Sequence, residues 1–278
     1  MKRFLRTITR YSSPIGTGAT PRELYHAVAA CASPRMIISL IIALGCLQWT
    51  VCAQAGSIVV PGAYATTESN VALYRENLPP VRFQMLYEAA EFASLGGPVL
   101  ITGLVGRPHA QQSSPASVSV LNFDYWLSTT NRTTSTLSPI FDDNRGADHT
   151  LVASYDPAYV FTTANIPGPG DTKEFDVVAM FSTPFRYDPA AGNLLLEVRT
   201  DGTMLESGTE FLTSGCVTGP SCPMRMVISI GSADATSGVY QDVGEIDLFL
   251  YEPVPEPASW VLTLGAVLGI CTAVRSRK

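Results

Sequence analysis

Short apolar runs separated by polar connections fill the chain between residues 56 and 251. Residues 98–105 form a near-continuous run of apolar and β-branched side chains, which predicts a strand. Residues 118–127 alternate apolar and polar side chains, and the alternation shifts near Leu121. A strand with a β-bulge at this point would produce such a shift.

Other runs of the same kind predict further strands, and turn-forming residues stand between them. The runs are residues 150–155, 173–181, 194–199, 224–230 and 244–251, and the turns are at 144–146, 167–170, 188–189 and 201–202. Strands at this spacing, joined by polar connections, predict a mainly β body: a single antiparallel β-sandwich, jelly-roll-like, over residues 56–252.

Residues 80–95 are the helical candidate of this body. Their apolar positions, which include Val81, Met85 and Phe92, do not fall on one helical face. The segment therefore predicts either one helix or a turn and a strand.

An uncharged apolar run, residues 36–51, precedes the body, with six basic residues upstream of it. Small residues at Ala53 and Ala55 follow the run. Together these features predict a secretory signal peptide over residues 1–55, handled by the Sec translocon and cleaved after Ala55 by signal peptidase. A retained membrane anchor is the alternative, although the run is short for a membrane span. Translation from Met36 would explain the unusual length of the leader.

A second apolar run follows the body. Pro255, Glu256 and Pro257 precede an apolar stretch over residues 260–274, and three basic residues close the chain. At about 1.5 Å per residue the stretch covers ~22 Å, so it is a marginal membrane span whose basic end should stay cytoplasmic. Residues 253–278 therefore predict a transmembrane tail that leaves the body outside.

A Pro-Glu-Pro motif, a hydrophobic helix and an Arg-rich end, in this order, resemble the PEP-CTERM sorting signal of exported bacterial proteins. The resemblance covers residues 254–278. It implies that an exosortase, a transpeptidase-like membrane protease, recognises the tail in the inner membrane. It also implies that the tail is removed as the body reaches the cell surface or the exopolysaccharide matrix. A proline-rich tether before an ordinary anchor is the alternative.

Several phrases of the body are similar to an uncharacterised family of exported PEP-CTERM proteins. They include Leu-Ile-Thr-Gly-Leu at 100–104, Gly-Ala-Asp at 146–148, Thr-Pro-Phe-Arg-Tyr-Asp-Pro at 183–189 and Ala-Gly-Asn-Leu-Leu-Leu-Glu-Val-Arg at 191–199. The similarity runs from about residue 97 to residue 200. It implies one β domain and no particular activity.

Charge is distributed unevenly along the chain. Residues 56–253 carry nine basic and 22 acidic side chains, whereas both ends are basic. Nucleic-acid binding requires a basic footprint, so the acidic body excludes a nucleic-acid partner. With 46% hydrophobic and 15% charged residues, the chain is not a disordered acidic polymer.

The chain has six cysteines, of which three belong to the leader and one to the tail. The remaining two, Cys216 and Cys222, flank a Gly-Pro turn. In an oxidising compartment this spacing predicts a local disulfide. A zinc site is the alternative, but it would need two further ligands and no histidine lies nearby.

Residues 142–148 gather oxygen-bearing side chains around a glycine. Asp142, Asn144 and Asp148 could supply oxygen ligands to calcium on a tight loop. The spacing is similar to the start of an EF-hand, without its bidentate glutamate or flanking helices. A solvated acidic turn whose side chains bond the local backbone is the alternative. Calcium is the sole cofactor that the sequence suggests.

Catalytic motifs are absent from the sequence of the body. It has two histidines, His109 and His149, and no nucleophile elbow, metalloprotease helix or phosphate loop. We therefore expect a non-enzymatic exported protein of structural or adhesive type, at the cell surface or in the extracellular matrix, with exopolysaccharide as a candidate partner.

Two other functions compete with this expectation. Asp124, Tyr125 and Trp126 could belong to a carbohydrate-binding module, which would show an exposed aromatic row. The other competitor is a polysaccharide hydrolase, which would show two carboxylates facing each other across a cleft.

Overall fold

Antiparallel strands account for most of the described chain. The structure is a computed structural model that describes residues 55–69 and 71–254. The strands are β1 (Gly56–Val60), β2 (Val71–Tyr74), β3 (Val81–Tyr87), β4 (Val99–Gly106), β5 (Ala116–Thr130), β6 (Thr150–Thr163), β7 (Val177–Tyr187), β8 (Asn193–Thr200), β9 (Gly202–Ser207), β10 (Leu212–Val217), β11 (Met224–Ile230), β12 (Val239–Gln241), β13 (Val243–Glu245) and β14 (Asp247–Pro253). The short 3-10 helices are η3 (Gly62–Tyr64), η4 (Ala89–Leu95) and η5 (Phe141–Asn144).

The strands form three sheets. Sheet A has the order β1-β14-β4-β7, and sheet B has the order β13-β10-β2. Sheet C has the order β12-β11-β3-β8-β5-β6, and β9 pairs with β5 beside β8. Neighbours in these orders are mostly distant in sequence, so side chains from many segments meet in one core.

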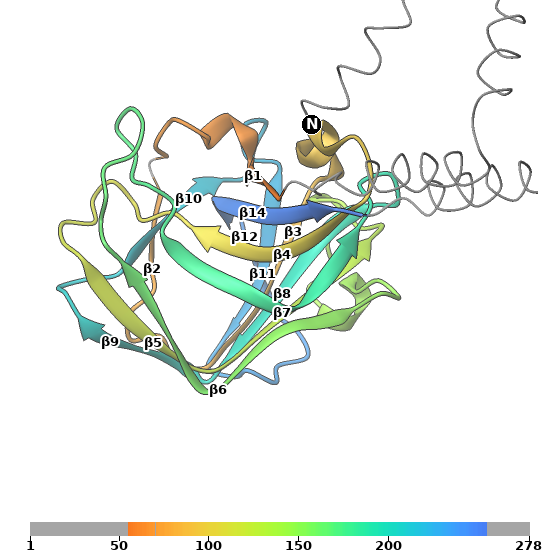
Figure 1. Cartoon of the computed structure of the whole chain (residues 1–278). Helices are drawn as coiled ribbons and strands as arrows, with labels where there is room; N and C mark the ends of the chain where they lie inside the picture. Colours follow the sequence, from red (N-terminus) through yellow and green to blue (C-terminus); the bar gives the residue numbers. More distant parts are fainter. Residues whose placement is uncertain (1–54, 70, 255–278) are drawn as a thin grey trace, which may run out of the picture. The chain divides into compact units, whose positions relative to one another are not determined.

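Sheets A and C pack against each other around the main hydrophobic core, and in Figure 1 β14 and β4 cross in front of β11 and β8. Phe249 of β14 meets Tyr87 of β3 edge to face, with ring centroids 5.1 Å apart. Ile101 of β4 and Leu196 of β8 are buried in the same core. The mainly β, antiparallel sandwich predicted from the apolar runs is confirmed at this level.

Strand β5 bends in its middle. Its register with β6 shifts between Leu121 and Phe123, and Asn122 between them has a φ of 44°. The Asn122 side chain donates to Asp201, which lies between β8 and β9, at 2.7 Å. The shift read from the alternation near Leu121 is thus a bulge, and it divides β5 into a half that pairs with β8 and a half that pairs with β9.

The other sequence expectations had mixed outcomes. Residues 224–230 coincide with β11, and β4 and β8 lie within a residue or two of their predicted runs. Of the two interpretations of residues 80–95, the single helix is wrong and the strand is correct, because this segment is strand β3 followed by the 3-10 helix η4. All seven side chains of β3 are buried, so both faces of the strand are in contact with protein and no period appears in its sequence.

Within residues 55–69 and 71–254, no helix is long and apolar enough to cross a membrane. The expected signal peptide and sorting helix fall outside these residues, apart from Ala55. The described residues belong to one compact unit, Ala53–Glu256.

Candidate functional site

A buried carboxylate lies on the face of sheet C that points away from the core. Arg145 binds both oxygens of Glu197, with Nε 2.9 Å from Oε2 and Nη2 2.7 Å from Oε1. Arg82 of β3 and Arg199 of β8 donate to Oε1 at 3.1 and 3.0 Å. One carboxylate therefore holds three guanidinium groups, which come from two strands and one loop.

The partners of Glu197 keep it ionised. Burial alone would raise the pKa of its carboxyl, but His149, the hydrogen bonds of Arg145 and Gln84, and the charge of Arg82 hold that pKa well below its usual range. A permanently ionised carboxylate cannot serve as a general acid near neutral pH. The arrangement suits a structural anchor.

Residues 131–149 form a loop that covers this anchor. Leu137 and Phe141 of the loop are buried against Leu86, Leu195 and Val227 of sheet C in a second hydrophobic cluster. This cluster lies on the opposite side of sheet C from the main core, so the sheet is covered on both faces here.

Polar bonds attach the same loop to the sheet. The side-chain amide of Gln84 donates to the Phe141 carbonyl at 3.0 Å and to Glu197 Oε2 at 2.8 Å. Asn144 in turn donates to the Gln84 side-chain oxygen at 2.9 Å. The loop is therefore fixed by a continuous hydrogen-bond network as well as by its apolar contacts.

The residues proposed for calcium lie in this loop, and their oxygens already have protein partners. Asp142 Oδ1 pairs with Arg145 at 2.7 Å, and Asn144 Oδ1 accepts from the Ser138 amide at 2.7 Å. Asp148 Oδ1 accepts from the Thr129 amide at 2.8 Å. The described residues contain no cluster of three or more acidic, histidine or cysteine side chains suited to a metal. One oxygen of each residue thus already has a protein partner, and the calcium site remains a prediction.

The aromatic residues of β5 point to opposite faces of sheet C. Tyr125 is buried in the main core. Trp126 lies on the outer face, stacked on His149 with centroids 6.2 Å apart and covered by Arg199 4.8 Å from its ring. Tyr125 and Trp126 therefore form no aromatic row. The ring of Trp126 already contacts His149 and Arg199, which are both partners of Glu197.

The second histidine of the body, His109, lies outside the loop of residues 131–149 and contacts backbone groups near it. His109 is buried, with Nε2 3.2 Å from the Ser69 carbonyl oxygen. The Gln111 amide donates to its Nδ1 at 3.2 Å. Both ring nitrogens are thus used in fixing the backbone.

Ionisable groups inside the sandwich are a feature that the sequence did not reveal. Arg75 donates to Glu245 at 2.6 Å, and the Tyr87 hydroxyl donates to Asp247 Oδ2 at 2.6 Å. Burial and the nearby charge of Glu245 raise the pKa of Asp247 well above its usual value of 3.8. In the sequence, Glu245 and Asp247 stand on either side of Ile246, so both side chains should point to the same face. This pattern is also typical of exposed strands, so it did not indicate burial.

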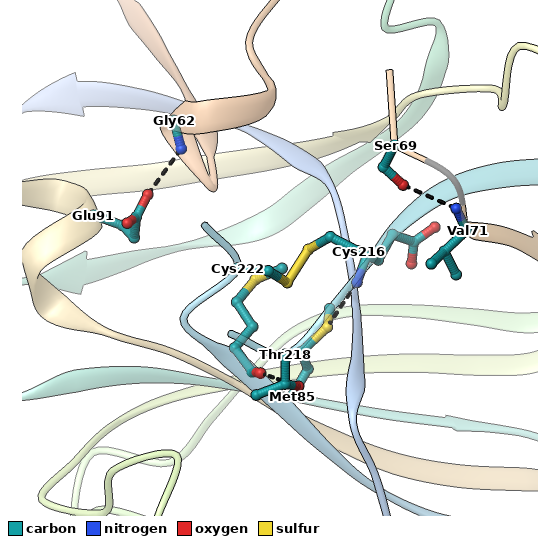
Figure 2. Close-up of a disulfide and its surroundings, with 10 residues drawn as sticks. Gly62, Ser69, Val71, Met85, Glu91, Cys216, Thr218 and Cys222 are labelled. Carbon is teal, nitrogen blue, oxygen red and sulfur yellow. Dashed lines mark hydrogen bonds between the residues drawn. A yellow bond between two sulfur atoms is a disulfide. The ribbon is translucent and has the colours of Figure 1, made fainter. Parts of the chain in front are cut away.

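The structure pairs Cys216 with Cys222, and Figure 2 shows this disulfide and its surroundings. Both cysteines are buried, and their Cα atoms are 6.0 Å apart. The Thr218 hydroxyl, within the bridged loop, donates to the Met224 carbonyl at 2.6 Å. Because Cys216 lies in β10 of sheet B and Cys222 precedes β11 of sheet C, the bond fastens the connection between two sheets.

Part of the outer face of sheet A, the face turned away from the core, is apolar. Phe249 and Ala179 point into the core, so the alternate residues Leu250 and Met180 point outward. They lie beside each other over Gly103, because a Cβ at Gly103 would be 3.2 Å from the Met180 sulfur and 3.4 Å from a Leu250 methyl. We define the outer apolar face by four residues, Val178, Met180, Leu248 and Leu250, of which Val178 is 38% and Met180 51% exposed.

The sorting motif lies outside the described residues. Pro255, Glu256 and Pro257 are not described, and neither is Ala53 of the predicted signal cleavage site. Ala55 is described, and it directly precedes β1.

Comparisons with known proteins place the chain in no family. No protein-family model and no curated protein matches it. A solved structure that matches weakly is the crystal structure of the infectious bursal disease virus VP2 subviral particle, at 13% identity over 74% of this chain and 42% of that chain. This chain spans less than half the length of that protein, and the TM-score is 0.14. A likeness at this level supports no conclusion about fold or function.

Proposed function

We propose that this chain is an exported surface protein of structural or adhesive type, without enzymatic activity. The leader and the PEP-CTERM-like tail support a route through the Sec translocon, signal peptidase and an exosortase, with an inner-membrane intermediate. The buried disulfide between Cys216 and Cys222 supports an oxidising compartment outside the cytoplasm. The end point of this route is the cell surface or the exopolysaccharide matrix.

The outer apolar face of sheet A is the observation that carries the adhesive role. Soluble proteins rarely expose contiguous apolar side chains, and those that do commonly use them as contact surfaces. Val178 and Met180 contribute exposed apolar surface at this face without being needed to fill the core. We therefore assign matrix or envelope contacts to this sheet.

The finer fold that we propose is a jelly-roll-like sandwich followed by a transmembrane sorting helix. The antiparallel pairing of all three sheets and their non-consecutive strand orders support the jelly-roll-like arrangement. The sorting helix is supported by the sequence of residues 253–278 alone.

The two competing functions find less support. Among the described residues, Tyr74 and Tyr240 are the aromatic side chains that are strongly exposed. Tyr74 belongs to β2 of sheet B, and Tyr240 belongs to β12, which three strands separate from β5 and Trp126 in sheet C. Glu245 and Asp247 are two residues apart in the chain and lie inside the sandwich, not on opposite walls of an open cleft. A structural role therefore suits the described surface better than sugar binding or hydrolysis.

Substitutions on the outer apolar face test the proposal. Val178→Thr with Met180→Thr keeps β-branched or strand-compatible side chains but removes apolar contact surface. We expect retention on matrix-bearing cells after washing to fall about tenfold, the effect of losing roughly one buried apolar side chain. Val217→Thr with Val239→Thr, exposed elsewhere, is the matched control. If both double variants are retained like the unmodified chain, the outer apolar face is not the adhesive surface.

A further inference from the structure

A cavity of about 390 Å³ lies inside the sandwich, and strands of all three sheets line it. Pockets that hold small molecules have volumes of roughly 300–1,000 Å³ and mostly apolar walls. This wall is mainly apolar too, with Phe83, Leu104, Val120, Phe161, Val198 and Met226 among its residues. Such a wall offers water few hydrogen bonds, so an apolar occupant is favoured over water.

One part of the cavity wall is polar. Arg75, Tyr125, Glu245 and Asp247 all line it, and Arg75 and Glu245 form an ion pair of 2.6 Å. Asp247 accepts the hydroxyl hydrogen bond of Tyr87, while its other oxygen, Oδ1, has no partner among the described residues. A ligand in the cavity would therefore meet an apolar wall and one polar group of side chains.

Tyr125 is a further polar residue of the cavity wall. Tyr125 is 7% exposed, and its hydroxyl forms no hydrogen bond with any described residue. Burial, followed by the charges of Glu245 and Asp247, raises the pKa of Tyr125 well above 10, so the hydroxyl stays protonated and can donate. The buried oxygen without a partner in this wall is Asp247 Oδ1, and the Tyr125 hydroxyl is a second group to which a ligand hydroxyl can bond.

The polar part of the cavity wall, formed by Arg75, Tyr125, Glu245 and Asp247, has little net charge. Arg75 and Glu245 compensate each other, and burial with the charge of Glu245 favours the neutral form of Asp247. A charged ligand group would lose its hydration here without gaining a counter-charge. The end therefore suits a neutral group such as a hydroxyl, which accepts from Tyr125 and can share a second hydrogen bond with the carboxyl group of Asp247.

The cavity has a route to solvent. Tyr74 of β2 and Ile230 of β11 line it, yet they are 61% and 65% exposed. Gln241 of β12 is a further exposed lining residue. Exposed apolar side chains from sheets B and C thus form an entrance that an apolar molecule can pass.

We propose that this cavity binds a small neutral amphiphile, an apolar molecule with a single hydroxyl that bonds the Tyr125 hydroxyl and lies against the wall of sheets A and C. At ~30 Å³ for each water-sized volume, the cavity accommodates on the order of ten to fifteen non-hydrogen atoms. Alcohols with about ten carbons meet this description. The binding site is separate from the outer apolar face, so the two proposals stand or fall independently.

Photolabelling of the full-length chain tests the site. The probe is a ten-carbon alcohol with a diazirine at its far end, and labelled peptides are located by mass spectrometry. We expect saturable labelling of cavity-lining residues, displaced by excess 1-decanol. Tyr125→Phe should weaken the alcohol about threefold to tenfold, as loss of one neutral hydrogen bond predicts, and leave the matching alkyl diazirine without a hydroxyl unaffected. Because the hydroxyl of Tyr125 has no protein partner, this variant should keep its fold.

Two further variants complete the design. Tyr155→Phe removes a hydroxyl outside the cavity, one that donates to the Met180 carbonyl at 2.6 Å, and should leave the alcohol affinity unchanged. Val120→Phe fills part of the cavity and should abolish labelling by both probes in protein whose circular dichroism matches the unmodified chain. Labelling that 1-decanol does not displace overturns the proposal, and so does an unchanged alcohol affinity in Tyr125→Phe. If Val120→Phe fails to fold, the comparison of Tyr125→Phe with Tyr155→Phe decides.

Discussion

Glu197 shows how a single side chain can fix a long loop on a sheet. Burying a carboxylate costs free energy. For Glu197 this cost is offset because three arginines and Gln84 all donate hydrogen bonds to its oxygens. Each of these partners is in turn attached to the loop or to sheet C. The network therefore acts as a unit, and removing its central charge should affect every partner at once.

Replacing Glu197 by Gln should lower the free energy of unfolding by about 3–5 kcal/mol, because the guanidinium groups remain partly buried without a counter-charge. Urea denaturation at neutral pH measures this difference. Asp242→Asn is the matched control, since Asp242 pairs with Arg225 at 3.0 Å but is 66% exposed. That exposed pair should be worth about 0–1 kcal/mol. Equal losses in the two variants would show that Glu197 is not an anchor.

The pH dependence of stability offers a second readout of the same substitution. The folded state holds the pKa of Glu197 well below the ordinary value of 4.5. A lowered carboxyl pKa stabilises the fold fully above the unfolded-state value, and this contribution is lost as the pH falls further. Unfolding free energies measured between about pH 6 and pH 3 should thus fall less steeply in Glu197→Gln. A parallel pH profile would contradict the lowered pKa.

Sequence could predict some of these residue roles and not others. The disulfide partners are close in the chain, so their spacing was informative. Glu197 looks like an ordinary outward-facing residue of an alternating strand, because its burial depends on a loop that lies about 50 residues earlier. The sequence offered Tyr125 only as a candidate for sugar stacking, and its place in the wall of the cavity depends on strands that are distant in the chain.

Among the elements, strands that keep one face exposed were the easiest to predict. The bulge in β5 was visible because the alternation of buried and exposed side chains changes phase there. Strand β3 gave no such signal, since all of its side chains are buried. The short strands β1, β2, β9, β10 and β12 were also missed, because their few residues do not establish a period.

The connection between β10 and β11 should depend on its disulfide. Replacing Cys216 and Cys222 together by Ala should lower the free energy of unfolding by about 2 kcal/mol, the chain-entropy value for a closed loop of this size. In unmodified exported protein, alkylation without prior reduction should label neither cysteine, as mass spectrometry can show. Free thiols at both positions would rule out the bridge.

The loop of residues 142–148 should respond to calcium no more than to general screening. One oxygen of each of Asp142, Asn144 and Asp148 already has a protein partner, so a bound ion would compete with these partners. We expect millimolar calcium to shift the melting temperature as much as sodium chloride of equal ionic strength does. A larger calcium shift that disappears in Asp142→Asn with Asp148→Asn would instead establish the site.

At the scale of the whole molecule, the sequence predicted the class of fold but not the internal arrangement of the strands. Apolar periodicity depends on which side chains are buried, so it indicates a sandwich directly. The order of strands within the sheets depends on pairing between distant segments, such as β1 with β14. The cavity follows from that order, because residues of β2, β5 and β13 line it together.

The two ends of the chain should be removed in the exporting host. The signal-peptide pattern predicts a mature protein that begins near Gly56, and the Pro-Glu-Pro tail predicts loss of the apolar residues 260–274. Glu256→Ala should leave the tail attached and the protein in the membrane fraction, because it removes the charged residue of the motif. Glu252→Ala, at the end of β14, removes a nearby glutamate outside the motif and should be processed normally. Intact-mass measurement of surface and membrane fractions distinguishes these forms. Surface protein that keeps both Trp260 and the terminal lysine, in cells with an active exosortase, would disprove the sorting route.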